Sequence, residues 1–597
     1  MAEVKSRCDI EEKYKWKLED IFKNDAEFEA AVSEVRALSK EFVKFRGRVG
    51  EGEKSILASL RLSDEIGEKL LSVVAYASMR RDEDNDVQKY RAMAERVGDL
   101  ESDIMSECSF FEPGLVAAGI ERIRGFFEKE PALFEYAHFF DNLFREQEHI
   151  LDEKSERLLA MSSPVGGSAH DIFSSMNNAD IKFGNVINEE GREEELTHSR
   201  YGIFLESNDR RVRKEAYNAM YAQYKAFKNT FASMYSGSIK SDLFYAKARG
   251  FESVRDMRLF DGNIPSDVYD GLLENVNHGL SALSEYLEMR KKVLGVDELS
   301  MYDLYVPIVP EDREEIPYEE AVEMVLAAVA PLGEDYVSDM RRAFSERWVD
   351  VYENRGKTSG AYSWGDNTTH PFVLLNYQGK IEDVFTLAHE MGHAMHSYYT
   401  NKKQPTVYRD YKIFVAEVAS TVNENLLMEY LLREATGNRR AYLLGRKLEA
   451  IRTTFYRQTM FAEFESRVHG MYMEGTPLTA ETLCKVYGEI NKKYYGSVCV
   501  CDENITYEWA RIPHFYTSFY VYQYATGFAA ATCIKNLVLE NLENARRYIE
   551  FLSGGNSAYP LNLLQGAGVD LTCADAVRSV VCDMEKTTKE LGDILDK

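Results

Sequence analysis

Apolar residues recur every three to four positions along most of this chain, a spacing that predicts amphipathic helices. Between residues 15 and 110, for example, Phe28, Val32 and Val35 share one predicted face, while charged residues fill the opposite face. The same periodicity returns from Asp209 onward. We therefore expect a mostly α fold.

Four short segments interrupt this helical pattern. Residues 162–168 are rich in Ser, Gly and Pro, which predicts a turn. Residues 181–198 alternate between apolar and polar side chains and predict a small β-hairpin. Three prolines predict a loop over residues 303–317, and the run Phe372–Tyr377, bounded by Pro and Gly, predicts a short strand.

One domain boundary is expected near residue 195, because a highly charged run, Glu189–Glu195, lies at the end of the predicted hairpin. This boundary separates an N-terminal helical domain, residues 1–195, from a second domain, residues 196–597. A chain of 597 residues is long enough for each domain to bury a sizeable core.

Composition narrows the classes of protein that fit this pattern. Only 13 of the 597 residues are proline, which leaves long stretches free to be helical. There are 72 Lys and Arg against 99 Asp and Glu, so the net charge is -27. Such an acidic surface repels the phosphates of nucleic acids and of anionic membranes. We therefore expect neither nucleic acid nor a membrane as a partner.

The cysteines and the N-terminal segment favour a cytoplasmic protein. The eight cysteines are scattered, which is typical of free thiols in a reducing compartment. The segment Met1–Cys8 and the acidic residues after it lack the apolar core of a secretory signal. No apolar run reaches the ~18 residues of a membrane span. The close pair Cys499 and Cys501 lacks the further ligands of a metal site.

The most informative segment is Ile381–Tyr399, which has helical spacing and contains His389, Glu390 and His393 in the order H-E-x-x-H. Residues four apart project from one helical face, so a single ion can bind both imidazoles. Glu390 lies about 100° around the helix, within reach of a water at that ion. With 11 His and at most 99 Glu, chance predicts about 0.03 such motifs per chain.

His396 does not extend this motif to the class of metalloproteases with three histidine ligands. That class needs Gly three residues after the second histidine and a further His three residues later. Here these positions are His396 and Tyr399. We expect His396 to be structural or to contact a metal ligand.

A site with two histidines needs a third protein ligand and leaves a fourth position for water. The candidate is Glu417 in a second predicted helix, where Phe414, Val415 and Val418 flank it. Burying an unpaired carboxylate there would be costly, although the pattern equally fits an exposed Glu on an amphipathic face. Glu424, seven residues on, lies on the same predicted face and is a candidate to orient a metal ligand.

Together these residues resemble oligoendopeptidase F, a group related to thimet oligopeptidase and neurolysin. The resemblance rests on the helix around His389, on the segment Phe414–Ser420, on the Tyr-rich segment Arg511–Gly527 and on the N-terminal run Tyr14–Phe22, so it covers essentially the whole chain. It implies that Glu417 is the third ligand and that each chain binds one Zn²⁺.

The resemblance also implies an architecture and a substrate class. The family fold has two helical lobes around a deep substrate channel, with zinc at its floor and a small β-sheet next to the zinc helix. It accepts short peptides and excludes folded proteins. Residues 196–597 would then form the catalytic zinc metallopeptidase domain.

The late segment carries Tyr516, Tyr520 and Tyr524, which would share one face of a continuous helix. The spacing alone favours an aromatic core. The resemblance instead assigns Tyr520 and Tyr524 to stabilising the transition state and His514 to contacting the substrate near the cleaved bond. It also suggests that Phe372–Tyr377 is an edge strand that pairs with the extended substrate, or else a purely structural strand.

We therefore hypothesise a zinc-dependent endopeptidase that hydrolyses internal bonds of short unstructured peptides. Zn²⁺ polarises the scissile carbonyl and activates a water, and Glu390 removes the proton of that water and later delivers it to the leaving amine. Two alternatives stay open. One is a dipeptidyl carboxypeptidase of similar fold, which needs a free C-terminal carboxylate. The other is a non-catalytic, peptide-binding scaffold with structural zinc.

Overall fold

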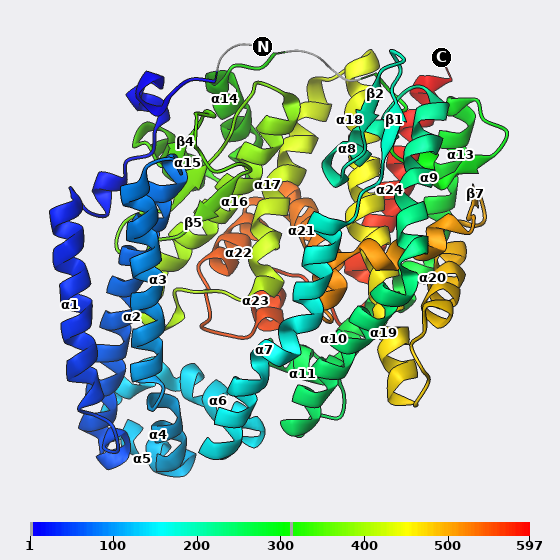
Figure 1. Cartoon of the computed structure of the whole chain (residues 1–597). Coiled ribbons are helices and arrows are strands. Elements are labelled where there is room, and N and C mark those ends of the chain that lie inside the picture. The colour runs from blue at the N-terminus through cyan, green and yellow to red at the C-terminus, as the bar shows by residue number, and fades with distance from the viewer. Residues whose placement is uncertain (1–3, 311–314, 597) are drawn as a thin grey trace. The chain divides into compact units, whose positions relative to one another are not determined.

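The computed structural model describes residues 4–310 and 315–596. These residues are predominantly helical, and their few strands are short (Figure 1), so the mostly α prediction is confirmed. The contacts divide the described chain into two compact units. The first unit contains residues 4–148, 315–430 and 534–568, and the second contains residues 149–310, 431–533 and 569–596. The domain boundary expected at residue 195 stays a prediction.

The first unit begins with three long helices, drawn in blue in Figure 1: α1 (Asp25–Val43), α2 (Glu53–Glu83) and α3 (Gln88–Cys108). The Asn24 side chain starts α1 by accepting hydrogen bonds from the backbone N–H groups of Ala26 and Glu27. Phe28 and Val35 are buried as their spacing predicts, in a core that Trp16 also joins. Three shorter helices follow, α4 (Phe111–Ala118), α5 (Ile120–Phe127) and α6 (Ala137–Glu146).

The rest of the first unit contains a small sheet and further helices. The strands are β4 (Val349–Asp350), β5 (Tyr362–Trp364) and β6 (Phe372–Leu374), in the order β4-β6-β5. The helices are α14 (Tyr318–Ala328), α15 (Glu334–Ser345), α16 (Ile381–Lys403), α22 (Leu542–Leu552) and α23 (Pro560–Gly566). The helix α17 (Ile413–Glu434) begins in this unit.

The strand predicted at Phe372–Tyr377 exists, but its expected position at a sheet edge is wrong. β6 is the middle strand, parallel to β4 on one side and antiparallel to β5 on the other. Its three residues are all buried, which is why the run is continuously apolar. The two edge strands of this sheet are β4, whose residues are buried, and β5, whose residues are half-buried.

A buried charge cluster joins β4 to the N-terminal segment. The Asp350 carboxylate accepts hydrogen bonds from Arg7 Nη1 and Nη2 at 3.0 and 2.5 Å, and from the Trp16 N–H at 3.3 Å. Lys357 Nζ, whose side chain is fully buried, lies 2.7 Å from Asp350 Oδ1. Nothing in the sequence pattern indicated this cluster, because Arg7 and Trp16 lie hundreds of residues before Asp350 and Lys357.

The second unit is also mainly helical. Its helices are α7 (Glu153–Ser175), α8 (His198–Leu205), α9 (Arg210–Ala226), α10 (Lys228–Ala248), α11 (Val254–Asp261), α12 (Ser266–His278), α13 (Leu280–Leu294), α18 (Gly437–Ala450), α19 (Arg457–Met473), α20 (Ala480–Tyr495) and α24 (Asp575–Leu595), and α21 (Tyr522–Glu540) begins in it. The predicted hairpin is confirmed as β1 (Asn185–Ile187) and β2 (Glu193–Glu195). β3 (Leu299–Ser300) pairs in parallel with β7 (Cys499–Val500).

The turn predicted over residues 162–168 is wrong, because α7 continues through Pro164 and both glycines. The packing of α7 against α10 explains the glycine at 166. A Cβ atom at Gly166 would lie 2.6 Å from Ser241 Oγ and 3.0 Å from the Tyr245 ring. The small residue therefore serves close helix packing rather than a turn.

The loop predicted over residues 303–317 includes residues 311–314, which lie outside the described residues. Before them, a short 3-10 helix ends at Asp303, and after them α14 begins at Tyr318.

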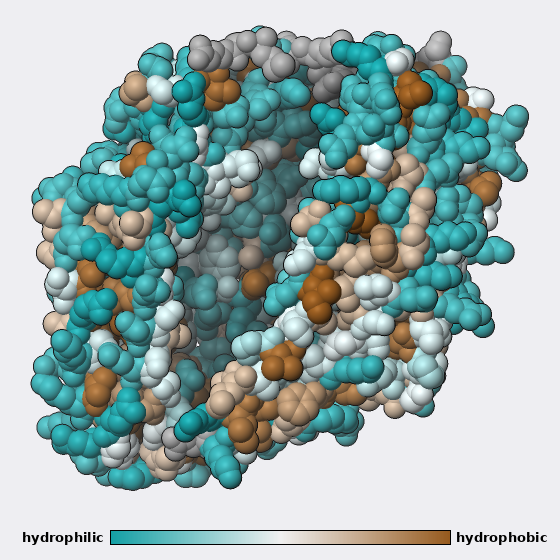
Figure 2. Space-filling model, in the orientation of Figure 1, coloured by the Kyte–Doolittle hydropathy of each residue, from teal (hydrophilic) through white to brown (hydrophobic). Residues whose placement is uncertain are grey.

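The hydrophilic surface and the unpaired cysteines agree with what the charge and the scattered cysteines of the sequence predict. The face shown in Figure 2 is mostly hydrophilic, and α7 is the helix with the most exposed apolar side chains, which are Leu158, Met161, Val165 and Ile172. All eight cysteines are free thiols. In the part of the chain that the structure describes, no helix has both the length and the apolar character needed to cross a membrane.

Candidate metal and catalytic site

The predicted motif helix is α16. The Asp383 carboxylate fixes its start by accepting hydrogen bonds from the backbone N–H groups of Lys380, at 2.9 Å, and Gln378, at 3.0 Å. The apolar side chains of Val384 and Leu387 are fully buried. The helix is therefore held in a fixed rotation about its axis, which directs His389 and His393 to one side.

The glycine inside the motif allows α17 to cross α16 at very short distance. A Cβ atom at Gly392 would lie 2.6 Å from the Cα of Ser420 and 2.7 Å from the carbonyl oxygen of Ala419. At the same crossing, the Asn423 side-chain amide donates to the Ala388 carbonyl at 3.1 Å. This contact brings Glu417 of α17 beside the two histidines, a role for Gly392 that the sequence did not indicate.

Three donor atoms converge at this crossing. His389 Nε2 and His393 Nε2 are 3.2 Å apart, and each lies 3.5 Å from Glu417 Oε2. A metal site needs at least three His, Cys, Asp or Glu side chains whose ligand atoms lie close together. Within the described residues, these three side chains form the one group that meets this requirement. The structure thus brings the three predicted metal ligands together.

The donor set fits a tetrahedral zinc ion. Zinc binds His nitrogen and carboxylate oxygen at about 2.0–2.2 Å, so two ligands of one tetrahedral ion are about 3.3–3.6 Å apart. The separations of 3.2 and 3.5 Å agree with this geometry. Two imidazole nitrogens and one carboxylate are also a ligand set that zinc commonly has in enzymes.

Glu424 contacts His389 at Nδ1, the ring nitrogen that is not one of the three converging ligand atoms. Its Oε1 atom lies 2.6 Å from His389 Nδ1, so Nδ1 carries the proton and Nε2 is left as the free donor atom. Burial disfavours the charged form of His389, but the hydrogen bond and charge of Glu424 outweigh it and raise the pKa to about 9, so a metal ion that binds at Nε2 would displace a proton from that atom. This contact agrees with the orienting role for which the sequence made Glu424 a candidate.

Glu417 is held in its ionised form. The neighbouring His393 imidazole lowers the pKa of Glu417 to about 2, against the opposing effect of partial burial. The Ser420 hydroxyl also donates to Glu417 Oε2 at 3.0 Å. A carboxylate that stays ionised is available as a metal ligand across the physiological pH range.

Glu390 is buried beside the donor atoms. Its burial raises the pKa of the carboxyl, while the nearby His389 and His393 act in the opposite direction. A carboxylate with a raised pKa is suited to accept a proton and then give it up again. Its place on α16 is therefore compatible with the predicted role of general base.

His396 is not one of the three side chains that converge as candidate metal ligands. Its ring is buried and stacks on Tyr411 at a centroid distance of 3.8 Å, and it also stacks on Phe551. Burial lowers its pKa to about 3, so the imidazole is neutral. Its Nδ1 atom has no hydrogen-bond partner among the described residues.

The second unit brings His514, Tyr520 and Tyr524 together. The Tyr524 hydroxyl lies 3.4 Å from His514 Nε2. The Tyr520 ring is 6.3 Å from the His514 ring and 5.4 Å from the Tyr524 ring, measured between centroids. These three predicted residues thus form one cluster with two phenol hydroxyls and one imidazole.

The predicted stripe of three tyrosines on one helix is wrong. A short 3-10 helix, η13 (Pro513–Tyr516), ends before the stripe would continue, and α21 begins only at Tyr522. Between them Phe519 has a φ of 57°, and its N–H donates to Glu465 at 2.7 Å. Tyr516 consequently stacks on Phe173 of α7, at 4.4 Å between centroids, and is separate from the cluster.

Comparison with protein families gives two matches. A model described as peptidase family M3 matches residues 203–580, and a model described as oligopeptidase F matches residues 115–183.

Two relatives match over nearly the full length. Oligopeptidase PepF of Bacillus subtilis is 41% identical over 597 residues, which is 100% of this chain and 89% of the relative. Group B oligopeptidase PepB of Streptococcus agalactiae is 41% identical over 594 residues, 99% of both chains.

Two solved structures are similar over almost the whole chain. The crystal structure of oligoendopeptidase-F from Enterococcus faecium has a TM-score of 0.74 and 35% identity to this chain. The match covers 96% of this chain and 99% of the chain in that structure. A crystal structure from Chlamydophila abortus has a TM-score of 0.92 and 33% identity, and covers 99% of this chain and 100% of its own.

Proposed function

This chain belongs to peptidase family M3 and is a metallopeptidase that hydrolyses peptides, and we propose that it is a zinc-dependent endopeptidase acting on internal bonds of short, unstructured peptides. The convergence of His389, His393 and Glu417 on one point, with separations of 3.2 to 3.5 Å, is the observation that supports this most strongly. One Zn²⁺ per chain fits these three ligands.

In this proposal the ion supplies Lewis acidity toward the scissile carbonyl and the attacking water. The chain's own residues hold and move the proton. Glu390 accepts a proton from the water and donates it to the nitrogen of the leaving amine. Glu424 holds His389 in the tautomer that leaves Nε2 free, and its negative charge strengthens the histidine as a donor.

His514, Tyr520 and Tyr524 are proposed to act on the substrate. Phenol hydroxyls and an imidazole N–H are hydrogen-bond donors, which stabilise the negative charge that develops on the carbonyl oxygen and hold the substrate backbone. Their mutual contacts support a shared task, because the Tyr524 hydroxyl is close enough to His514 for each to limit the other's orientation.

The site of action proposed for the enzyme is the cytoplasm, which the free thiols support. The net charge of -27 argues against nucleic acid as a partner and leaves short peptides as the substrate class. The proposed domain division has an N-terminal helical domain, residues 1–195, and a catalytic domain, residues 196–597.

The test is mass spectrometry of products from a peptide library of graded length, with each peptide offered free and blocked at both ends. An endopeptidase cleaves internal bonds of blocked peptides, up to a length limit. Cleavage only of peptides with a free C-terminal carboxylate would instead identify a dipeptidyl carboxypeptidase. Absence of products from zinc-loaded protein would identify a binding scaffold and overturn the proposal.

A further inference from the structure

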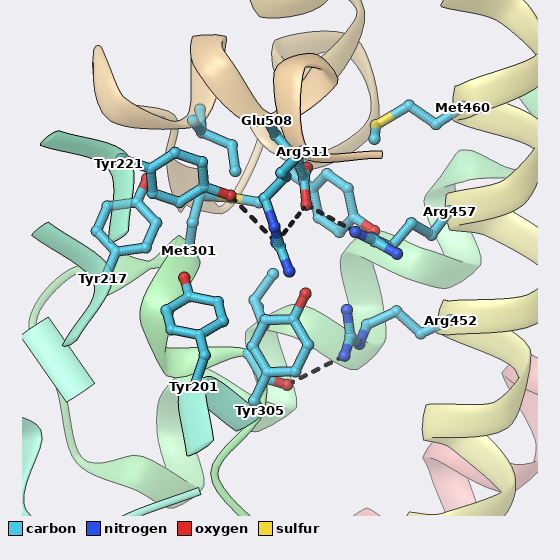
Figure 3. Close-up of a pocket in the computed structure, with 13 residues that line it drawn as sticks. Tyr201, Tyr217, Tyr221, Met301, Tyr305, Arg452, Arg457, Met460, Glu508 and Arg511 are labelled. Carbon is cyan, nitrogen blue, oxygen red and sulfur yellow. Dashed lines mark hydrogen bonds and ion pairs between the residues drawn. The ribbon is translucent and has the colours of Figure 1, made fainter. Parts of the chain in front are cut away.

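A small cavity in the second unit is lined by three arginines and five tyrosines, together with apolar side chains (Figure 3). Arg452 lies in the π-helical turn η11 (Ile451–Tyr456), Arg457 begins α19, and Arg511 ends the 3-10 helix η12 (Asn504–Arg511). Tyr201 of α8 and Tyr221 of α9 face them. The volume of about 10 Å³ is enough for one water molecule or one monatomic ion.

Among the residues that the structure describes, the charges around this cavity do not balance. Three lining guanidinium groups face one lining carboxylate, that of Glu508. Arg457 forms a close ion pair with Glu508 at 2.7 Å, whereas Arg511 is 3.5 Å from the same oxygen. Glu508 can therefore neutralise only one of these two arginines.

Arg452, the third arginine, pairs with Glu449, which does not line the cavity. Arg290 shares this carboxylate. Arg452 Nη2 lies 2.6 Å from Glu449, and Arg290 lies 3.3 Å from the same carboxylate. Both arginine side chains are 1% exposed. Four guanidinium groups thus share two carboxylates, and burying uncompensated positive charge carries a high energetic cost.

The hydroxyl groups at the cavity do not supply the missing negative charge. Burial raises the pKa of Tyr201 and Tyr221, so both phenols are neutral hydrogen-bond donors. The Tyr495 hydroxyl is buried and has no hydrogen-bond partner within the described residues. Figure 3 shows the Arg511 guanidinium among the side chains of Tyr201, Tyr221 and Tyr305. The described residues that line the cavity therefore offer more hydrogen-bond donors than acceptors.

We propose that this cavity binds one monatomic halide ion, with Arg511 as its main charged partner and tyrosine hydroxyls as further donors. A halide supplies the further negative charge and the further acceptor that would balance the excess of arginines and donors. A water molecule accepts hydrogen bonds but leaves the charge uncompensated. Sulfate and phosphate are too large for the volume of about 10 Å³.

The proposed ion would stabilise the segment that leads to His514. Glu508 and Arg511 belong to η12, and after Ile512 the chain continues directly into η13, which contains His514. An ion held by Arg511 therefore fixes the end of η12 and the start of η13. This inference rests on the charges in the second unit and does not depend on the proposed metal site.

Bromide is the probe for a direct test, because its anomalous scattering distinguishes it from water. Crystals of the full-length protein are soaked in sodium bromide, and data are collected at the bromine absorption edge. We expect an anomalous peak in the cavity next to Arg511. Density without an anomalous peak, which means water only, would overturn the proposal.

A solution test compares thermal unfolding in sodium bromide with unfolding in sodium gluconate of the same ionic strength. The variants are Arg511→Gln and Tyr495→Phe, and the control is Arg467→Gln, which removes an exposed arginine paired with Glu489. The Tm of the unmodified protein and of the control should rise with bromide and reach a plateau.

In Tyr495→Phe, the bromide concentration that gives half of the rise in Tm should increase by at least about tenfold, since the variant loses the hydrogen bond from the Tyr495 hydroxyl to the ion. In Arg511→Gln, the rise should disappear. If Arg511→Gln does not fold, Tyr495→Phe still decides the matter because it keeps the aromatic ring. Equal bromide responses in Tyr495→Phe and the control would contradict the role of the cavity.

Discussion

Glu424 acts on the candidate metal site through a single contact, the 2.6 Å hydrogen bond to His389. Replacing Glu424 by Gln removes the charge and keeps the shape of the side chain. We expect metal affinity to fall by about 10- to 100-fold, as for other carboxylates that orient a histidine ligand. Competition with a fluorescent zinc chelator measures the change.

The matched control for this substitution is Glu434→Gln, which changes an exposed residue at the end of the same helix. It should bind metal with unchanged affinity. Peptidase activity of Glu424→Gln should recover at high zinc concentration, because the variant loses affinity and keeps the catalytic residues. Unchanged affinity in Glu424→Gln would show that the hydrogen bond does not support the ligand.

How far individual residues could be predicted depended on whether their spacing was local. His389, Glu390 and His393 followed from helical periodicity, because all three lie within two turns. The residue pattern alone left Glu417 open between an exposed and a metal-binding carboxylate, since its partners are on another helix, and only the family resemblance made it the third ligand. Gly392 was not predicted, because its role depends on the backbone of α17, which approaches to within 2.6 Å of a Cβ placed there.

At the scale of elements, the crossing of α16 and α17 sets the geometry of the three donors. Substituting Gly392 by Ala places a methyl group against the backbone of Ser420 and Ala419, where neither helix can adjust cheaply. We expect a loss of about 1–3 kcal/mol in the free energy of unfolding, as in other overpacked cores. Metal affinity should fall with it, because Glu417 moves away from the histidines.

Gly98→Ala in α3 is the control, because a Cβ there meets nothing within 4 Å. This variant should gain about 0.5–1 kcal/mol from the better helix propensity of alanine. Urea unfolding of the two variants side by side gives the comparison. If the urea midpoint of Gly392→Ala equals that of the unmodified protein, α16 and α17 can move apart without an energetic cost, and the prediction is wrong.

The Asp350 cluster makes a second prediction at this scale. Asp350→Asn leaves the buried Lys357 without its counter-charge and leaves Arg7 with Glu83 as its remaining partner, so the free energy of unfolding at pH 7 should fall by about 3–5 kcal/mol. Glu323→Gln is the control, since it breaks only an exposed pair with Arg341, worth about 0–1 kcal/mol. Urea unfolding followed by circular dichroism measures both.

The pH dependence of this effect has a defined sign. Burial disfavours ionised Asp350, but Lys357 and Arg7 outweigh it and lower its pKa below the ordinary value of about 4. The stabilisation is therefore present above about pH 4 and is lost as pH falls through the lowered pKa. The difference between Asp350→Asn and the unmodified protein should shrink over that range. A constant difference down to pH 2 would contradict the assignment.

Element types were predicted well where one face is apolar, and wrongly where tertiary packing overrides local preference. Ser, Gly and Pro at 162–168 read as a turn, yet they lie in α7, where Gly166 lets α10 approach. The tyrosines at 516, 520 and 524 have helical spacing, yet Phe519 interrupts the helix because Glu465 binds its backbone N–H. Both contacts join residues far apart in the sequence, so periodicity carries no information about them.

At the scale of the whole molecule, each unit has its own buried core, and the candidate metal ligands belong to one of them. Removing the metal with a chelator should therefore abolish peptidase activity and leave most of the helix content. The Tm should drop, because at 1,000 times its Kd a ligand stabilises the folded state by about 4 kcal/mol. Adding zinc back should restore both activity and Tm, and helix content lost together with the metal would contradict this prediction.

The central claim is that Glu390 transfers the proton while His389, His393 and Glu417 hold zinc. The most direct test is kcat/KM of Glu390→Gln on a blocked peptide, with zinc content measured on the same sample. For Glu390→Gln we predict one zinc per chain and a kcat/KM that is lower than that of the unmodified enzyme by about 10²- to 10⁴-fold. Turnover close to that of the unmodified enzyme in the zinc-loaded variant would contradict the account.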